Sequence, residues 1–147
     1  MKILIGSVAG RSKSEVDGLV DGYVERCAAY ARVETAGFRS VAAFFEHVEK
    51  LRARTAPLVV LLDSRGKALS SEGLASWLRE RRDGGQQMLV FGVGPADGWG
   101  EVARSGAGML LSLGPMTLPH ELARLVLAEQ IYRAFTILAG HPYHSGH

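Results

Sequence analysis

The stretch GMLLSLGPMTLPHELARLVLAEQIYRAFTILAGHPYH, residues 108–144, decides how this chain folds. It begins with an apolar run at residues 109–113, whose length is typical of a fully buried β-strand. A Gly-Pro pair at residues 114–115 interrupts the run. Thr117 can then cap a helix that extends to about Ala139. The sequence therefore predicts a buried strand, a turn and a long helix in immediate succession.

The predicted helix, which Gly140 and Pro142 end, has no clean polar face. Its apolar residues follow two stripes: Leu118, Leu122, Leu125 and Tyr132 on one, and Ala123, Leu127, Ile131, Ala134 and Leu138 on the other. An amphipathic surface helix leaves roughly half its circumference polar, whereas a helix that is apolar nearly all round is buried on several sides. This pattern predicts a helix at the centre of the fold or at a subunit interface, and we expect dimerisation through it.

The narrow polar strip of the helix includes Glu129 and Arg133, which are four residues apart. Such a pair stabilises an exposed helix by only ~0.2–0.5 kcal/mol. An ordinary surface ion pair and a functional role for Arg133 are both compatible with this spacing.

The composition indicates one globular domain over residues 1–147, with 47% hydrophobic and 22% charged residues. The net charge of +2 permits an anionic partner but does not establish one. Cys27 is the single cysteine, which excludes an internal disulfide and a cysteine-based metal site. The sequence has neither a secretory signal nor a run of ~20 apolar residues that could span a membrane. We therefore expect a soluble cytoplasmic protein.

Helical and strand patterns alternate along the rest of the chain. Strands are predicted at residues 2–5, 32–35, 58–62, 87–91 and 109–113, and the earlier helices at residues 14–27, 41–54 and 70–82. Such alternation is typical of an α/β domain with a largely parallel sheet. Ligands of these sheets bind beyond the carboxyl ends of the strands, which directs attention to three turns. These turns lie at residues 63–67, 92–100 and 112–117.

Two short motifs suggest chemistry without establishing it. The turn GVGPADG, residues 92–98, resembles a dinucleotide-binding loop, but the third glycine of G-x-G-x-x-G falls on Asp97. The spacing therefore argues against a Rossmann loop, and a tight glycine-rich connection is the other interpretation. The tail carries histidines at positions 141, 144 and 147, without a carboxylate or cysteine to complete a metal site. A loose polar tail is the simpler interpretation, and we expect no metal.

Three segments are more specific: LLDSRGKALSSEGLA (61–75), VGPADG (93–98) and LSLGPMTLPHELARLVLAEQIYRA (111–134), the last followed by HPYH (141–144). On these segments the chain resembles the RlmH family of 23S rRNA pseudouridine methyltransferases, within the knotted SPOUT superfamily. The resemblance extends over the whole length and is strongest in the C-terminal block.

The resemblance implies one α/β domain with a mostly parallel sheet, a C-terminal trefoil knot and assembly as a homodimer. It also implies that S-adenosylmethionine (SAM) binds in the knot, held mostly by backbone groups of the three turns. Apolar walls with backbone donors and acceptors suit a purine ring. Carried over position by position, the SAM contacts are Leu62, Gly94, Leu113, Gly114, Pro115, Met116, Thr117 and Leu118.

The reaction implied is methyl transfer to N3 of a pseudouridine in 23S rRNA of the assembled ribosome, with no membrane or DNA as partner. N3 carries a weakly acidic proton, so the enzyme must position the base and help to remove that proton. The residues expected near the target base are Arg133, His141, Tyr143 and His144. None of them is singled out as the general base. We expect this tail to fold back beside a SAM pocket, either its own or that of the other subunit.

Two positions depart from the family's pattern. The family commonly has two adjacent glycines where this chain has Gly94-Pro95, and proline offers no backbone donor. The family's tail often continues HPYH with arginine, whereas Ser145 follows here. A knotted or Rossmann-like nucleotide-binding protein without methyl transfer is the alternative function.

Overall fold

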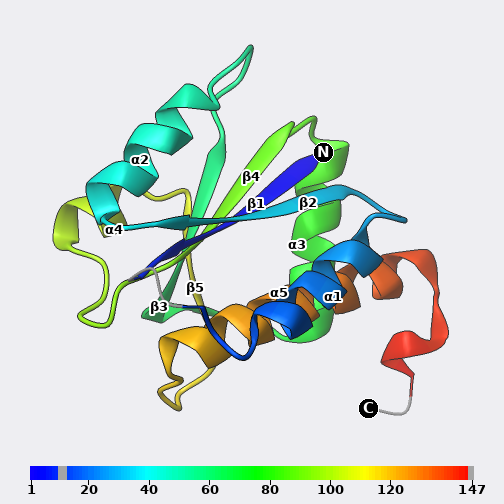
Figure 1. The fold of residues 1–147 in the computed structure, drawn as a ribbon. Helices are drawn as coiled ribbons and strands as arrows, with labels where there is room; N and C mark the ends of the chain where they lie inside the picture. Colours follow the sequence, from blue (N-terminus) through cyan, green and yellow to red (C-terminus); the bar gives the residue numbers. More distant parts are fainter. Residues whose placement is uncertain (10–12, 146–147) are drawn as a thin grey trace.

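A five-stranded, fully parallel sheet forms the middle of the molecule, in the order β2-β1-β4-β3-β5 (Figure 1). The computed structural model describes residues 1–9 and 13–145. The strands are β1 (Lys2–Val8), β2 (Arg32–Phe38), β3 (Leu58–Ala68), β4 (Met88–Val93) and β5 (Met109–Ser112). The helices are α1 (Asp17–Cys27), α2 (Val41–Lys50), α3 (Ser71–Asp83), α4 (Glu101–Gly106), α5 (His120–Ala139) and the short 3-10 turn η1 (Pro142–His144). The predicted α/β class is confirmed.

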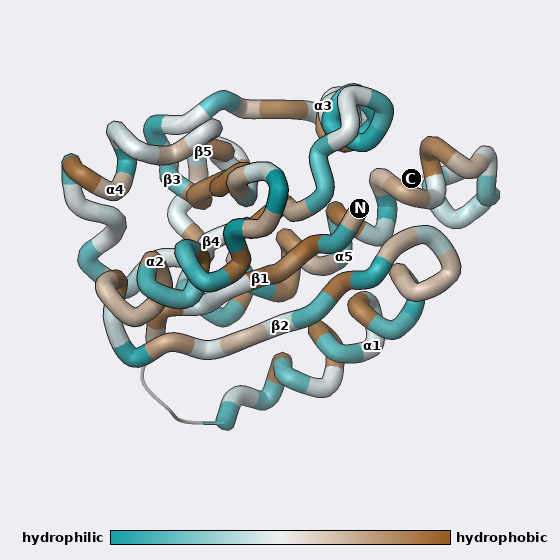
Figure 2. The backbone as a smooth tube through the Cα atoms, turned by 90° about the horizontal axis from the view of Figure 1, so that it is seen from above, coloured by the Kyte–Doolittle hydropathy of each residue, from teal (hydrophilic) through white to brown (hydrophobic). Residues whose placement is uncertain are grey.

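Helices cover both faces of the sheet, so the central strands are apolar on both sides. One core cluster joins the sheet to α1, α3 and α5, and the other joins it to α2 and the segment around α4. Alternate residues of β1 serve the two clusters, with Ile3 in the first and Leu4 in the second. Figure 2 shows the hydrophobic residues concentrated along β1, β3 and β4. In the described part of the chain, none of the helices is long and apolar enough to cross a membrane.

The ends of several elements differ from the prediction. Helix α5 begins at His120, with Pro119 at its N-cap position, and not near Thr117. A residue before proline is disfavoured in the helical conformation, so Leu118 cannot extend the helix backwards. Helix α4 has only six residues and was missed. The predicted end of α5 at Ala139 is confirmed.

Strand β3 is longer than predicted because it pairs twice with β5. After Leu62 the ladder shifts register, and pairing resumes with Lys67 beside Leu111. Within the shifted segment, Gly66 lies directly against the backbone of β5. An added Cβ there would be 2.5 Å from the carbonyl carbon of Leu110. The trefoil knot concerns the threading of the chain, which strand order does not test, and it stays a prediction.

Helix α5 packs against α1 and α3, and this packing explains most of its apolar circumference. Ile131 is 0% exposed within the single chain. The apolar pattern was therefore no argument for a subunit interface, because the central position already accounts for it. The outer side of α5 keeps some apolar surface, since Leu122 is 45% exposed. Dimerisation through that side stays a prediction.

An ion cluster joins the start of α1 to the start of α5. The guanidinium of Arg124 donates to the carboxylates of Asp17 and, at 2.9 Å, Glu121. A backbone hydrogen bond from Ser14, together with Arg124, lowers the pKa of Asp17 below its ordinary 3.8. Burial alone would raise the pKa of Glu121, but hydrogen bonds from Ser14 and Arg124 outweigh it and lower that pKa below 4.5. The cluster thus favours both ionised carboxylates in the folded state.

We expect this cluster to make stability depend on acidity below about pH 4.5, the ordinary pKa of glutamate. Lowered folded-state pKa values stabilise the fold above the unfolded-state values, and that contribution is lost as the pH falls through the folded-state values. Urea unfolding between pH 3 and 7 measures this effect. The free energy of unfolding of Arg124→Met should fall less toward pH 3 than that of the unmodified protein. Arg52→Met is the control, because the Arg52–Glu49 pair is exposed. Identical acid profiles for Arg124→Met and the unmodified protein would contradict the expectation.

Candidate functional site

A pocket of about 780 Å³ lies beyond the carboxyl ends of β4 and β5 and beside the middle of β3, where the pairing of β3 with β5 shifts register. All three turns expected to bind a ligand contribute to its wall, through residues 62–65, 93–99, 111, 113–114 and 116–118. Seven of the eight predicted SAM contacts line it: Leu62, Gly94, Leu113, Gly114, Met116, Thr117 and Leu118. Pro115 is not among the lining residues. The structure therefore gathers most of the predicted cofactor residues around one cavity.

The pocket has the size and wall of a small-molecule site, since such sites enclose about 300–1,000 Å³ and are mostly apolar. Its apolar wall is formed by side chains from all three turns and from the start of α5. They are Leu62, Val93, Trp99, Leu111, Leu113, Leu118 and Ala123. The described residues hold no group of three or more side chains suited to a metal ion. His147, one of the tail histidines considered for zinc, lies outside the described residues.

Short polar contacts fix two of the predicted turns, of which the first forms part of β3 and the second follows β5. The Asp63 carboxylate, whose side chain is 6% exposed, accepts from the backbone N–H of Arg65 at 2.8 Å and from its Nε at 3.3 Å. The Ser112 hydroxyl accepts from the Gly114 N–H and donates to the Gly114 carbonyl, both at 3.1 Å. These bonds hold backbone groups of both turns in place at the pocket.

The turn after β4 is held by two residues that the sequence interpretation missed. Trp99 is 3% exposed and packs between this turn and α2, with its ring 5.3 Å from that of Phe44. His120 places its Nδ1 2.7 Å from the Gly94 carbonyl oxygen. The available signal for His120 was its position, since it lies three residues after the end of the predicted third turn.

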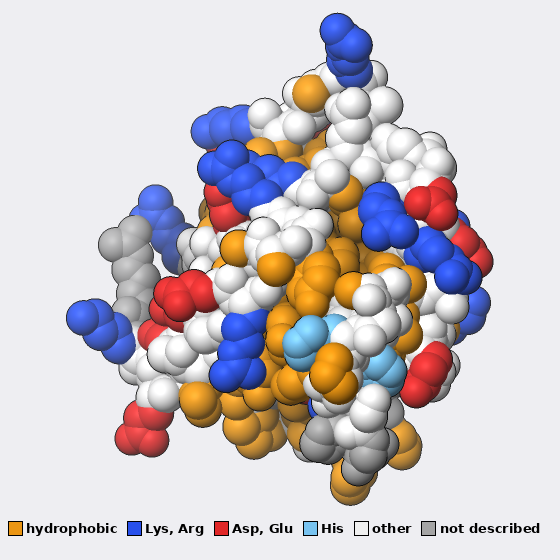
Figure 3. Space-filling model, turned by 90° about the vertical axis from the view of Figure 1, so that its right-hand side faces the viewer, with side chains coloured by type: hydrophobic (Ala, Val, Ile, Leu, Met, Phe, Trp, Pro, Cys, Tyr) orange, Lys and Arg blue, Asp and Glu red, His pale blue; other side chains and the backbone are white. Residues whose placement is uncertain are grey.

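The residues predicted to meet the target base lie at the far end of α5. Arg133 donates to Glu129 at 2.9 Å, and its guanidinium carbon is 5.0 Å from the centre of the Tyr143 ring. The Tyr143 ring is 4.7 Å from that of Tyr132. His141 accepts through Nδ1 from the Tyr143 N–H at 3.1 Å. Figure 3 shows histidine side chains within an apolar area of this face, bordered by charged side chains.

The environment of this tail sets the protonation of two residues. Burial, with a hydrogen bond to Tyr23 and the nearby Glu129 charge, raises the pKa of Tyr143 to about 12. This environment therefore favours the neutral phenol. The hydrogen bond to Glu129 raises the pKa of Arg133, which keeps the guanidinium charged. The Glu129–Arg133 spacing seen in the sequence is thus a real, partly buried ion pair.

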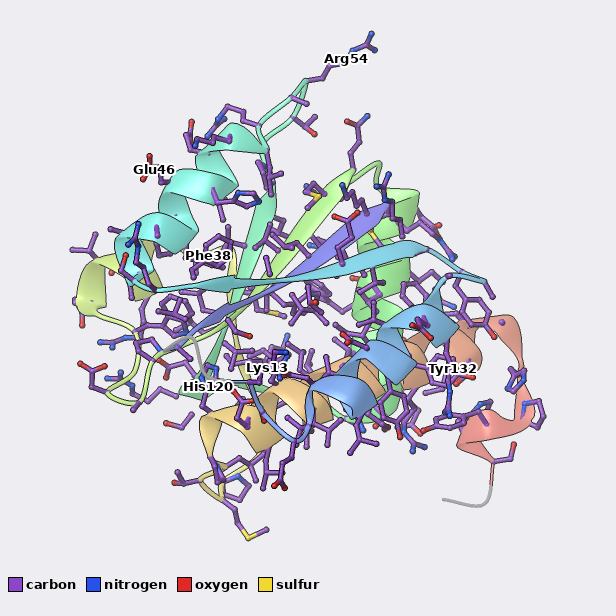
Figure 4. All side chains as sticks on the ribbon, viewed as in Figure 1. Lys13, Phe38, Glu46, Arg54, His120 and Tyr132 are labelled. Atoms are coloured by element: carbon purple, nitrogen blue, oxygen red, sulfur yellow. The ribbon has the colours of Figure 1, made fainter. Side chains whose placement is uncertain are left out.

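The pocket and the tail of one chain are far apart. His120 lines the pocket, and α5 runs from His120 to Ala139 before the tail begins. A helix of that length spans about 30 Å at a rise of 1.5 Å per residue. Figure 4 shows His120 and Tyr132 well separated along α5. The tail packs onto its own end of the helix, so it does not fold back beside the pocket of the same chain.

Comparison with known proteins gives a consistent set of relatives. The family model described as predicted SPOUT methyltransferase matches residues 1–144. The chain is 44% identical over 147 residues to the ribosomal RNA large subunit methyltransferase H of Koribacter versatilis, with 100% of each chain covered. It is 40% identical over 158 aligned positions to the protein of that name from Mesorhizobium japonicum, covering 98% of this chain and 99% of the relative.

Solved structures agree at the level of the fold. A probable methylase family protein from Haemophilus influenzae superposes with a TM-score of 0.53 at 13% identity, over 99% of this chain and 70% of that one. The SpoU methyltransferase AviRb from Streptomyces viridochromogenes, solved with AdoMet, gives a TM-score of 0.50 at 13% identity, over 95% of this chain and 58% of that one. Such low identities show a shared fold alone.

Proposed function

Since the chain belongs to the SPOUT methyltransferase family, we propose that it methylates N3 of a pseudouridine in 23S rRNA, with SAM as methyl donor. Methylation of large-subunit rRNA is supported by the full-length similarity to the two methyltransferase H proteins. The choice of N3 of pseudouridine, the assembled ribosome as substrate and a cytoplasmic site of action rest on the resemblance of the HPYH tail and the C-terminal block. The same similarity argues against a nucleotide-binding protein without methyl transfer.

The pocket fits SAM in size, wall and position. Its apolar side chains suit the adenine ring and exclude water, and the turn backbones offer donors and acceptors at the ring's edge. Bound SAM would supply an electrophilic methyl group for transfer to nitrogen. We assign the holding of SAM to Leu62, Gly94 and residues 113–118, with Pro115 acting by shaping the turn, since it does not line the cavity.

The tail supplies groups suited to holding a pyrimidine base. Tyr143 offers a ring for stacking, and Arg133 holds a positive charge beside that ring. A cation near N3 favours the deprotonated base, because it stabilises the negative charge left on the ring. His141 and His144 lie next to Tyr143, and imidazoles exchange protons near neutral pH. These residues position the base and assist loss of its proton.

The reaction requires two copies of the chain, with the tail of one beside the pocket of the other. The support is the length of α5, which separates the pocket from the tail within one chain. A two-fold arrangement brings the same surfaces of both copies together and builds two equal sites. The outer side of α5, with Leu122 partly exposed, offers an apolar surface for this contact.

Two measurements test the proposal. Calorimetry should show binding of SAM in preference to NAD and ATP, and the enzyme should methylate ribosomes that lack the modification at N3 of a pseudouridine. Binding of NAD or ATP without SAM, or methylation at another position, would contradict the assignment.

The shared site has its own test, in which two inactive variants are mixed. One variant lacks residues 141–147, and the other is Ala123→Trp, which fills the pocket. After random reassociation, half of the dimers contain one copy of each variant. Each of these mixed dimers has one intact site out of two, so about a quarter of the activity of the unmodified protein should return. A mixture as inactive as its parts would show that pocket and tail do not act across two chains.

A further inference from the structure

His120 connects two of the three turns that form the pocket. It is the first residue of α5, and its ring reaches back to the turn after β4 (Figure 4). Its Nδ1 lies 2.7 Å from the Gly94 carbonyl oxygen. Its Nε2 is buried, has no hydrogen-bond partner among the described residues, and lies 3.8 Å from the Glu121 carboxylate. The ring is therefore held by one short bond, to Gly94.

The bond to Gly94 fixes which nitrogen of His120 carries a proton. A carbonyl oxygen only accepts hydrogen bonds, so Nδ1 must be the donor. In the neutral ring, Nε2 then carries the lone pair. The structure thus requires an Nδ1–H imidazole at this position.

The Gly94 peptide needs support from outside its own turn. Pro95 has no N–H, so the peptide after Gly94 cannot donate a hydrogen bond. The bond from the Gly98 N–H to the Pro95 carbonyl, at 2.8 Å, lies within the turn and does not tie it to a helix. Trp99 closes one side of Gly94, because an added Cβ would be 2.8 Å from the Trp99 Nε1. His120 holds the carbonyl of the same residue.

We propose that His120 is a positioning residue for the cofactor: its Nδ1–H fixes the direction of the Gly94 carbonyl and so keeps the Gly94 backbone in the geometry that binds SAM. This inference rests on the proposed function, because Gly94 is assigned to SAM there. His120 acts through Gly94 and takes no part in the transfer of the methyl group. It also ties the start of α5 to the turn after β4, while Arg124 ties the same end of the helix to α1 through Glu121 and Asp17.

Substitution by two amides separates positioning from a general structural role. The side-chain nitrogen of asparagine can take the place of Nδ1, whereas that of glutamine resembles Nε2. We expect His120→Ala and His120→Gln to raise the Kd for SAM at least about tenfold, because the Gly94 carbonyl loses its donor. His120→Asn should stay within about threefold of the unmodified protein. His47→Asn is the control, because His47 lies on α2 beside Phe38 and does not line the pocket.

Two results would overturn the proposal. The first is equal SAM affinity for the asparagine, glutamine and alanine variants. The second is a loss of SAM affinity that parallels the loss of melting temperature from variant to variant. A measurement without ligand distinguishes this failure from failure of the proposed function. Long-range ¹H–¹⁵N spectra should show a proton on Nδ1 of His120, and a ring protonated at Nε2 alone overturns the proposal even if the protein binds SAM. An Nδ1–H form in a protein that binds no SAM would instead refute the assigned cofactor.

Discussion

Removal of residues 141–147 lowers methylation of ribosomes by at least about 100-fold, the low end for a lost acid–base group, and leaves the affinity for SAM nearly unchanged. The pocket is complete without the tail, because its lining residues all lie between Leu62 and Ala123. The groups lost are those proposed to hold the target base, among them the Tyr143 ring above Arg133. Stacking of a ring on a base contributes ~1–3 kcal/mol in single-stranded recognition. Calorimetry and a methylation assay on the same preparation measure the two effects.

Point variants keep this experiment interpretable if the deletion weakens the fold. Tyr143→Phe preserves the ring packed against Tyr132 and removes only the phenol, so its methylation should lie between those of the full chain and the deletion. The double variant His141→Ala with His144→Ala removes two of the tail imidazoles and keeps the Tyr143 ring. Full activity of the deleted protein would show that the tail has no part in the reaction. Loss of SAM binding would show that the tail builds the pocket.

Gly66→Ala reduces the free energy of unfolding by about 1–3 kcal/mol or more, or prevents recovery of folded protein, because overpacking against a rigid neighbour has this cost. The added methyl group would lie 2.6 Å from the Leu110 carbonyl oxygen and 2.7 Å from the Leu111 nitrogen. These are backbone atoms of a buried strand, so no rotamer change relieves the contact. Separation of β5 from β3 would also open the wall of the pocket, and SAM binding should fall with stability.

The matched control is Gly22→Ala on α1, where an added Cβ meets nothing within 4 Å. Alanine is a better helix former than glycine, so this variant should gain about 0.5–1 kcal/mol. Urea unfolding compares both variants with the unmodified protein. A Gly66→Ala protein within about 1 kcal/mol of the unmodified one would mean that β3 can move away from β5 at little cost.

The sheet was predictable because its central strands are short apolar runs buried on both faces. The run LVVLL at residues 58–62 gave the beginning of β3 correctly. Its continuation through Asp63 to Ala68 is polar and pairs only after a shift in register against β5, a contact between distant segments that no local pattern contains. Helix α4 was missed because six residues are too few to show a helical period.

The site was predictable in position but incompletely in its members. The rule that ligands bind beyond the carboxyl ends of parallel strands identified the three turns of the pocket. His120 and Trp99 escaped notice because their importance arises from contacts with Gly94 that only the folded chain makes. The tail was expected beside a SAM pocket. Its distance from the pocket of the same chain depends on whether α5 is one unbroken helix, and the structure shows that it is.

Helix α5 lines the pocket at one end and carries the tail at the other. Its length therefore sets the distance between the residues proposed to hold SAM and those proposed to hold the target base. Insertion of one residue in its middle would turn everything beyond it by about 100° and advance it by 1.5 Å. Such a change would move Arg133 and Tyr143 and would also turn Ile131 and Phe135 out of the core. Natural changes in chain length should therefore be confined to the loops, while the number of residues between His120 and Gly140 stays constant from one member of the family to the next.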